Sequence, residues 1–299
     1  MSFVPGWVFP GQGTVPSTRW DDTALARRLS DASTDAGLDL LALFDGPASE
    51  ERLQTRVAQP LILIDCVVKA SKLRQAGVGC RVVAGHSLGE YAALVAADVL
   101  DPLDALRIVM RRGELMDRIA GGMMAIVKLD TAAAEELCHE SGGDVVVANR
   151  NSPQQTVVSG RLDALTEMAE RVEQIGGRAI RLGVSGPFHS PLMSDAEAQL
   201  RPMIEACRFE DPMVPVVSSV TGEVVRNGGR LKELLSSQIT ASVEWMAVLD
   251  SLAGEGVTHV VEVGPGTVLA GIGKRNPVEL AYLSYEEAER WANSSSESP

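Results

Sequence analysis

The sequence predicts an α/β protein in which a small subdomain of order β-α-β-β-α-β is inserted into a larger domain built on a mainly parallel sheet. Short apolar runs that suit buried strands alternate with longer segments of helical periodicity. With 299 residues, 45% of them apolar, the chain can bury a large core and a second, smaller one. The pattern of the elements changes near residue 123 and changes back near residue 183.

The larger domain begins with the apolar run at 7–9, which predicts a short buried strand ended by Pro10-Gly11. The apolar run that starts at Leu61 continues through Leu73, which is too long for a strand and therefore predicts a buried helix. The other expected elements of this domain are strands at 81–84, 215–220 and 259–263 and helices at 90–97, 104–116, 231–238 and 245–255.

The insertion has its own sequence of elements. We expect strands at 123–128, 145–148, 156–159 and 178–182 and helices at 131–140 and 162–175. This order is the ferredoxin-like pattern, and it is nearly self-contained. We therefore expect an α/β-hydrolase-like large domain formed by residues 1–122 and 184–285, a ferredoxin-like subdomain at 123–183, and a disordered Ser- and Glu-rich tail at 286–299.

The composition disfavours several classes of function. The formal net charge is −13 and aromatic residues make up 4%, so we expect no nucleic-acid partner. The four cysteines are far apart and form no CxxC pair, which argues against a zinc site or a disulfide framework. No apolar run reaches about 18 residues, and the start of the chain lacks a signal-peptide pattern, so we expect a cytoplasmic protein without a membrane partner.

Ser87 is the candidate nucleophile. It lies in the pentapeptide GxSxG at 85–89, directly after an expected strand and directly before an expected helix. A serine on this tight turn is exposed, and the amide of Leu88 at the helix start points to where an oxyanion would form. The alternative is a serine that only caps the helix, but the coincidence of strand, turn and helix favours the catalytic interpretation.

A serine hydroxyl needs a base, and His189 is the best of the four histidines. It lies on a loop bounded by Gly and Pro, where the chain re-enters the large domain and can reach a cleft. His139 belongs to a Glu-rich surface helix and His259 to a buried strand. His86 adjoins the serine but points away from it on the turn, which suits a supporting role.

Acyl transfer also needs a second oxyanion donor. The glycine-rich segment at 11–13 follows the first strand, so the amide of Gln12 can approach the site closely. Alone this segment predicts only a turn, and it becomes informative beside the Ser87 motif.

Together these motifs resemble the malonyl-CoA:acyl carrier protein transacylase family, which includes polyketide-synthase acyltransferase domains. The resemblance runs from about residue 7 to residue 275. Its elements are FPGQG at 9–13, QP at 59–60, GHSLGE at 85–90, RG at 112–113, NSP at 151–153, GPFHSPLM at 186–193 and EVGPG at 262–266. Several ordered motifs are far more specific than any one of them.

The resemblance implies a malonyl group carried on Ser87, with His189 as base and the amides of Gln12 and Leu88 as oxyanion donors. It implies that a main-chain carbonyl orients the histidine, for which Gln238 is the candidate. Arg112 matches the arginine that binds the malonyl carboxylate, and Phe188 is typical of malonyl-using members. By their motifs, Gln59 and Asn151 are assigned to substrate binding.

The resemblance further implies malonyl-CoA as substrate, an acyl carrier protein as partner, and no metal or redox cofactor. Arg178, Arg181 and Lys274-Arg275 are candidates for a basic docking patch, although scattered surface charges are an equal alternative. Fatty acid synthesis is the first choice of pathway. A stand-alone transferase for a polyketide synthase, a malonate decarboxylase subunit, a serine thioesterase and a non-catalytic docking protein are the alternatives.

Overall fold

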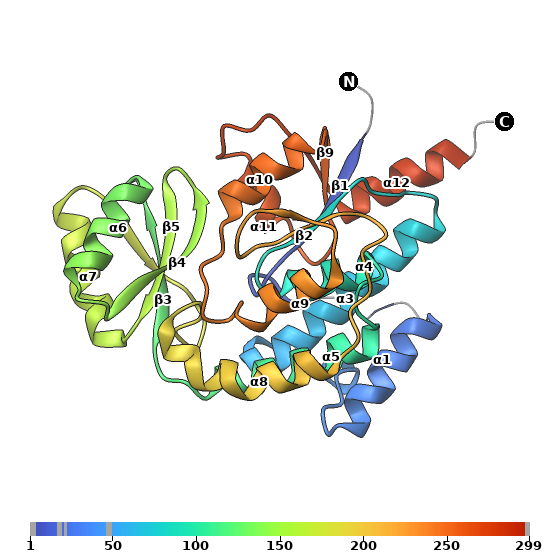
Figure 1. The fold of residues 1–299 in the computed structure, drawn as a ribbon, viewed down its shortest axis with the longest axis horizontal. Helices are drawn as coiled ribbons and strands as arrows, with labels where there is room; N and C mark the ends of the chain where they lie inside the picture. The colour runs from blue at the N-terminus through green and yellow to red at the C-terminus, as the bar shows by residue number, and fades with distance from the viewer. Residues whose placement is uncertain (1–3, 17–19, 21–22, 46–49, 297–299) are drawn as a thin grey trace.

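The computed structural model of the chain describes residues 4–16, 20, 23–45 and 50–296. It is a mixed α/β structure with a mainly parallel sheet and a separate antiparallel sheet. In Figure 1 the antiparallel sheet lies with its two helices at one side of the molecule, drawn in green and yellow, and the parallel sheet with its covering helices fills the other side.

The parallel sheet has the strand order β10-β9-β1-β2-β7-β8, and only the pairing of β7 with β8 is antiparallel. Its register aligns Phe9, the last residue of β1, with Gly85, the last residue of β2. The segments that follow these two strands therefore leave the sheet side by side. The strands are β1 (Pro5–Phe9), β2 (Val83–Gly85), β7 (Val216–Val217), β8 (Val224–Val225), β9 (His259–Glu262) and β10 (Ala281–Ser284).

Both faces of this sheet are covered, as expected for parallel strands. Along β1, Trp7 and Phe9 pack into the core of one face, with the long buried helix α3 (Thr55–Gln75), whereas Val8 packs into the core of the other. Helices α10 (Trp245–Gly254) and α11 (Val268–Gly273) cover that second face. The remaining helices around the sheet are α1 (Ala24–Asp35), α2 (Ala42–Asp45), η1 (Glu50–Leu53), α4 (Gly89–Ala96), α5 (Pro102–Asp117), η2 (Pro191–Met193), α8 (Ser194–Ala206), α9 (Gly228–Ser236) and α12 (Tyr285–Ser296).

The antiparallel sheet has the strand order β4-β5-β3-β6 and its own apolar core. Along the chain its elements follow the predicted order β-α-β-β-α-β, and α6 begins and ends at the predicted residues. The elements are β3 (Gly122–Val127), α6 (Thr131–Glu140), β4 (Val145–Ser152), β5 (Gln155–Gly160), α7 (Leu162–Gln174) and β6 (Arg178–Arg181).

Several expectations need correction. The tail beyond residue 285 forms α12 as far as Ser296, because Tyr285, Ala288 and Ala292 present an apolar face that packs into the main core; the end of the predicted tail, 297–299, lies outside the described residues. The strand expected at 215–220 is only two residues long. Helix α8, directly after the His189 loop, was not anticipated. Within the described chain, no helix has the length and apolar content needed to cross a membrane.

Candidate active site

Ser87 lies at the turn between β2 and α4 with strained backbone geometry. Its φ is +53°, in the left-handed region that non-glycine residues rarely adopt. The neighbouring glycines make the turn possible: a Cβ at Gly89 would lie 2.0 Å from the carbonyl oxygen of Phe9, and a Cβ at Gly85 would lie 2.0 Å from the carbonyl carbon of Gly89. Any side chain at these positions would collide with backbone, that of the turn itself at Gly85 and that of β1 at Gly89.

His189 reaches the serine from a loop 102 residues later in the chain. Its Nε2 lies 2.7 Å from Ser87 Oγ, and its Nδ1 lies 3.1 Å from the carbonyl oxygen of Gln238 and 2.9 Å from that of Ala241. Carbonyl oxygens only accept hydrogen bonds, so Nδ1 carries the proton and donates it. Nε2 is therefore the nitrogen left to accept a hydrogen bond from the hydroxyl of Ser87.

The protonation state of His189 suits a general base. Burial is the largest cause, and the positive charge of Arg112 the second, that lowers the pKa of His189 to about 3. The imidazole is 3% exposed. It is therefore neutral at pH 7, which is the form that can take a proton from a serine hydroxyl.

Arg112 reaches Ser87 from α5. Its side chain is fully buried, with Nη2 at 3.0 Å from Ser87 Oγ and 3.4 Å from the side-chain oxygen of Gln238, and its guanidinium carbon lies 5.8 Å from the ring centre of Tyr91. Burial lowers the pKa of Arg112. Among the described residues no carboxylate forms an ion pair with it, and its Nε has no hydrogen-bond partner. A buried cation that no carboxylate of the described chain contacts directly is costly, even with the charge of Glu90 nearby, so this position favours an anionic ligand.

Gln238 connects the members of the site. Its main-chain carbonyl accepts a hydrogen bond from His189 Nδ1, and its side-chain amide donates to the carbonyl oxygen of Ser87 at 2.9 Å and to the carboxylate of Glu90 at 2.6 Å. Burial raises the pKa of Glu90, which also accepts a hydrogen bond from the hydroxyl of Ser219. The sequence motif contains Glu90 without indicating its role, and the resemblance covers the segment 238–245 but singles out Gln238, not Ala241.

The segment after β1 packs against the Ser87 turn. A Cβ at Gly11 would lie 2.8 Å from the carbonyl oxygen of His86, so the glycine allows this close approach. The Gln12 side chain donates to Thr55 Oγ1 at 3.2 Å and accepts from buried Gln59 at 3.4 Å. In the described chain, no hydrogen bond uses the backbone amide of Gln12 or of Leu88, at the start of α4, as its donor.

A cavity of about 580 Å³ lies between the two sheets, and Ser87 and His189 are part of its wall. Gln12, Asn151 and Phe188 also line it, whereas Arg112, Gln59, Leu88 and Gln238 lie behind the wall. Asn151 does more than face the cavity, because its side-chain oxygen lies 3.0 Å from His86 Nε2 and so braces the serine turn from the small sheet. The small-sheet wall further carries Ala125, Asn149, Gln155 and Val157.

The four basic candidates have different surroundings. Arg275 lines the cavity, and no ion pair with it occurs among the described residues. Arg181 donates instead to Leu162 O and Thr166 Oγ1 on α7, within the small subdomain. Arg178 is exposed on β6, the strand that also carries Arg181, and Lys274 is exposed next to Arg275.

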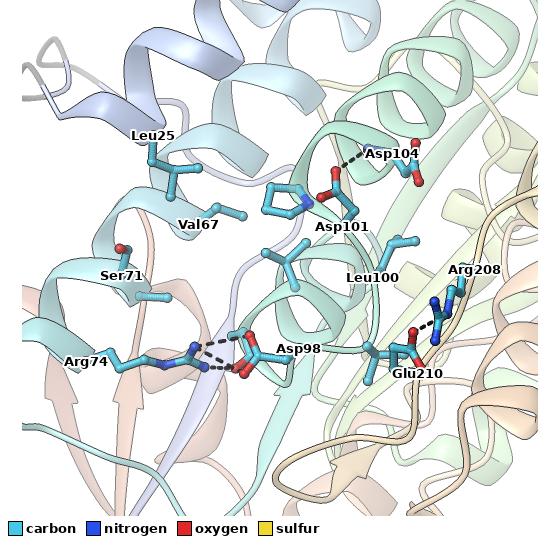
Figure 2. A pocket seen from close by; sticks show the side chains of 15 residues that line it. Leu25, Val67, Ser71, Arg74, Asp98, Leu100, Asp101, Asp104, Arg208 and Glu210 are labelled. Atoms are coloured by element: carbon cyan, nitrogen blue, oxygen red, sulfur yellow. Dashed lines mark hydrogen bonds and ion pairs between the residues drawn. The ribbon is translucent and has the colours of Figure 1, made fainter.

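A second hollow, of about 400 Å³, lies away from this site among α1, α3, α4 and the start of α5 (Figure 2). Two pairs of its charged side chains bind each other, Arg74 with Asp98 at 3.2 Å and Arg208 with Glu210. Of the residues that the structure describes, no histidine, cysteine or tyrosine lines it. We assign it no chemistry.

Comparisons with known proteins agree with one another. Residues 21–282 match the family model of the acyl transferase domain. A malonyl CoA-acyl carrier protein transacylase from Synechocystis is 38% identical over 92% of this chain and 94% of its own length.

Solved structures extend the similarity to the fold. An acyl-carrier-protein S-malonyltransferase from Burkholderia pseudomallei superposes with a TM-score of 0.89 at 35% identity, over 97% of this chain and 100% of that one. A malonyl-transacylase solved in complex with a type II PKS acyl-carrier protein has a TM-score of 0.90 at 31% identity, over 98% of this chain and 99% of that one.

Proposed function

The chain belongs to the acyl transferase family that contains the malonyl CoA-acyl carrier protein transacylases, and we propose that it moves a malonyl group from CoA to the phosphopantetheine thiol of an acyl carrier protein through an ester on Ser87. The observation that carries this proposal is the contact of Ser87 Oγ with a neutral imidazole on one side, at 2.7 Å, and a buried guanidinium on the other, at 3.0 Å.

In the first half-reaction Ser87 Oγ attacks the thioester carbonyl while His189 Nε2 takes its proton. The amides of Gln12 and Leu88 receive the developing oxyanion, a role that their lack of other acceptors in the described chain supports. The C–S bond then breaks, and the proton on His189 passes to the leaving CoA sulfur. The second half-reaction is the reverse with a different thiol: His189 takes the carrier-protein proton, the thiolate attacks the ester, and Ser87 regains its proton.

Arg112 gives this reaction its substrate class. A guanidinium offers a planar fork that matches a carboxylate in a bidentate pair, so the free carboxylate of malonyl supplies the missing counter-ion. An acetyl group would leave the cation buried and unpaired. Removing one partner of such a pair costs about 3–5 kcal/mol, or roughly a hundredfold to several-thousandfold in preference.

The cavity suits the arm that CoA and a carrier protein share. Asn149 and Gln155 line it from the small sheet, and the side-chain oxygen of each is buried without a partner in the described chain. A pantetheine arm carries two amide N–H groups that can donate to such oxygens. Arg275, on the same cavity, is our candidate contact for the phosphate or for an acidic carrier surface, with Lys274 beside it.

Every step above moves a proton or an acyl group, and side chains and backbone amides supply both kinds of chemistry. We therefore propose that no metal or redox cofactor takes part. Fatty acid synthesis remains our first choice of pathway. A polyketide system is the second candidate, favoured by the similarity to a transacylase solved with a type II PKS carrier.

We also propose finer names for the two parts of the fold. The strand order β4-β5-β3-β6, all antiparallel, supports a ferredoxin-like subdomain at 123–183. The strained serine turn on a mainly parallel sheet supports an α/β-hydrolase-like large domain formed by the flanking segments.

Intact-mass measurement with a panel of acyl-CoAs tests the function. We expect a stable malonyl adduct on the protein with malonyl-CoA alone, which an acyl carrier protein then removes. Rapid release of free malonate without a carrier would indicate a thioesterase instead. No adduct with any acyl-CoA would indicate a non-catalytic docking protein and overturn the proposal.

A further inference from the structure

The segment at 238–244, between α9 and α10, supports the base. Two of its carbonyl groups, those of Gln238 and Ala241, accept the hydrogen bond from His189 Nδ1. The segment has no regular secondary structure apart from an isolated bridge at Val243. An imidazole held in this way keeps its orientation only while the carbonyl groups keep theirs.

The edge strand β4 of the small sheet holds the backbone of this segment. The amide of Val243 donates to the carbonyl oxygen of Ala148 at 2.8 Å, and the amide of Arg150 donates to the carbonyl oxygen of Val243 at 2.9 Å. The hydroxyl of Ser242 donates to the carbonyl oxygen of Val147 at 2.6 Å. The position of the His189 support therefore depends on a strand from the other sheet.

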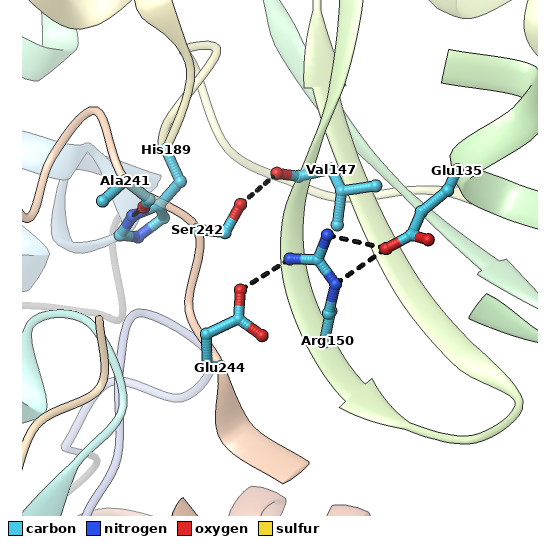
Figure 3. A network of polar contacts seen from close by, with 7 residues as sticks. All are labelled: Glu135, Val147, Arg150, His189, Ala241, Ser242 and Glu244. Carbon is cyan, nitrogen blue, oxygen red and sulfur yellow. Dashed lines mark hydrogen bonds and ion pairs between the residues drawn. The ribbon is translucent and has the colours of Figure 1, made fainter. Parts of the chain in front are cut away.

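A side-chain contact reinforces this attachment (Figure 3). The guanidinium of Arg150 binds Glu135 of α6 through Nη2 at 2.7 Å and Nε at 3.0 Å, and binds Glu244, at the end of the segment, through Nη1 at 2.6 Å. Side chains of Arg150 and Glu244 are each only 28% exposed, which reduces screening by solvent. The guanidinium of Arg150 thus joins α6 of the small subdomain to the 238–244 segment that supports His189.

We propose that Arg150 is a positioning residue for the base: by holding Glu244 it fixes the 238–244 segment, and through the carbonyl groups of Gln238 and Ala241 it fixes His189 against Ser87. The kinetic part of this proposal rests on the acyl transfer proposed above. The alternative is that Arg150 only adds stability, as a surface ion pair does.

Two variants and one control separate these possibilities. Arg150→Met removes the fork and keeps most of the apolar stem, and Glu244→Gln removes one charge and keeps the shape. Arg171→Met is the matched control, because Arg171 pairs with Glu140 inside the small subdomain, and among the described residues no hydrogen bond or ion pair joins it to the 238–244 segment. The Tm of every variant is measured first, so that a loss of stability is separated from a change in the position of His189.

The first measurement is the ¹⁵N NMR spectrum of the imidazoles, with His189 assigned by comparison with His189→Gln. We expect Arg150→Met and Glu244→Gln to broaden or shift the Nδ1–H signal of His189, and Arg171→Met to leave it unchanged. The second is the kcat of acylation by malonyl-CoA, which we expect to fall about threefold to tenfold in both variants with little change in KM. The double variant should lose no more than Arg150→Met alone, because both changes break one contact.

An unchanged His189 signal and an unchanged kcat in Arg150→Met would overturn the proposal, as would equal losses in Arg150→Met and Arg171→Met. If Arg150→Met does not fold, Glu244→Gln decides between the same outcomes. The NMR measurement needs no substrate. A wild type that fails to react with malonyl-CoA would refute the proposed function, whereas an unaltered imidazole signal would refute the positioning role.

Discussion

The turn that carries Ser87 and the loop that carries His189 hold their side chains in opposite ways. The serine turn is set mainly by its own glycines, Gly85 and Gly89, which permit close backbone contacts within the turn and with Phe9 of β1. The histidine is fixed by residues about 50 positions away, Gln238 and Ala241, whose segment is itself attached to a different sheet. Both residues have positive φ, 53° and 58°, so each is strained and must be held in place.

This difference shows where the two halves of the site are vulnerable. The nucleophile depends on local sterics and tolerates little change in its own pentapeptide. The base depends on the packing of two sheets against each other, so substitutions far from it in the sequence can move it.

The largest effect should follow from removing the nucleophile. Ser87→Ala leaves His189 in place but removes the hydroxyl that its Nε2 contacts, so the malonyl adduct should disappear and transfer should fall by about a millionfold, as in other serine enzymes. Intact-mass and radiolabel transfer assays measure both. A covalent adduct that persists in this variant would reject the assignment of Ser87.

Arg112 contacts both Ser87 and Gln238, which supports His189. Removing its guanidinium should change the preference between acyl groups more than it changes the fold. Arg112→Met should lower transfer of malonyl relative to acetyl by about a hundredfold to several-thousandfold, because the bidentate carboxylate pair is lost. Competition between malonyl-CoA and acetyl-CoA gives the ratio. Arg107→Met is the control, since Arg107 is an exposed member of the same helix that pairs with Asp104. An unchanged ratio in Arg112→Met would remove Arg112 from substrate binding.

A test of the local half is Gly89→Ala. The added Cβ would meet the Phe9 carbonyl oxygen, so the turn must shift, and a displacement of about 1 Å at a reacting atom costs roughly a hundredfold in rate. The acylation rate should fall by that factor or more. Gly254→Ala, where no atom lies within 4 Å of the new Cβ, serves as control. If both variants keep full activity, glycine does not set the serine turn.

The smallest expected effect is in the pH dependence of kcat/KM, which tests the surroundings of His189. Because the pKa of His189 lies near 3, the base is neutral above that pH, and kcat/KM for malonyl-CoA should show no loss of activity as pH falls from 8 to 5. Arg112→Met removes a charge that lowers this pKa, so its acid limb should move to higher pH. Stopped-flow acylation rates report both. A wild-type acid limb near pH 6.5 would show that His189 titrates as in solvent.

The same pKa has a consequence for stability. The unfolded chain binds a proton at His189 near pH 6.5, whereas the folded chain binds it only near pH 3. The free energy of unfolding should therefore decrease as pH falls from about 6.5 to about 3, with a smaller decrease in His189→Gln.

Much of this architecture was accessible from the sequence because its signals are local. The two-sheet α/β class, the buried helix α3 and the limits of α6 follow from periodicity, and the Ser87 turn follows from five adjacent residues. Helix α8 was not predicted, although Ala196, Leu200 and Ile204 recur at helical spacing, because Pro202 lies inside it and proline usually breaks a helix. Tail polarity likewise hid the apolar face of α12.

What sequence could not provide is the long-range part of the site. The resemblance pointed to the segment 238–245 and to Gln238 within it, but it could not single out Ala241, because any residue supplies a carbonyl group. Glu90 and the Arg150 fork depend on partners more than 90 residues away, Gln238, Ser219 and Glu244. Such contacts are set by how the two sheets pack, which no short window of sequence reveals.

In the protein without substrate, the buried guanidinium of Arg112 forms no ion pair with a carboxylate of the described chain. The carboxylate of the proposed malonyl group carries the opposite charge, so acylation of Ser87 would supply an ion-pair partner for Arg112 as well as start the reaction. The malonylated protein should therefore have a higher Tm than the unmodified protein. Thermal unfolding would then report what fraction of the protein carries the acyl group.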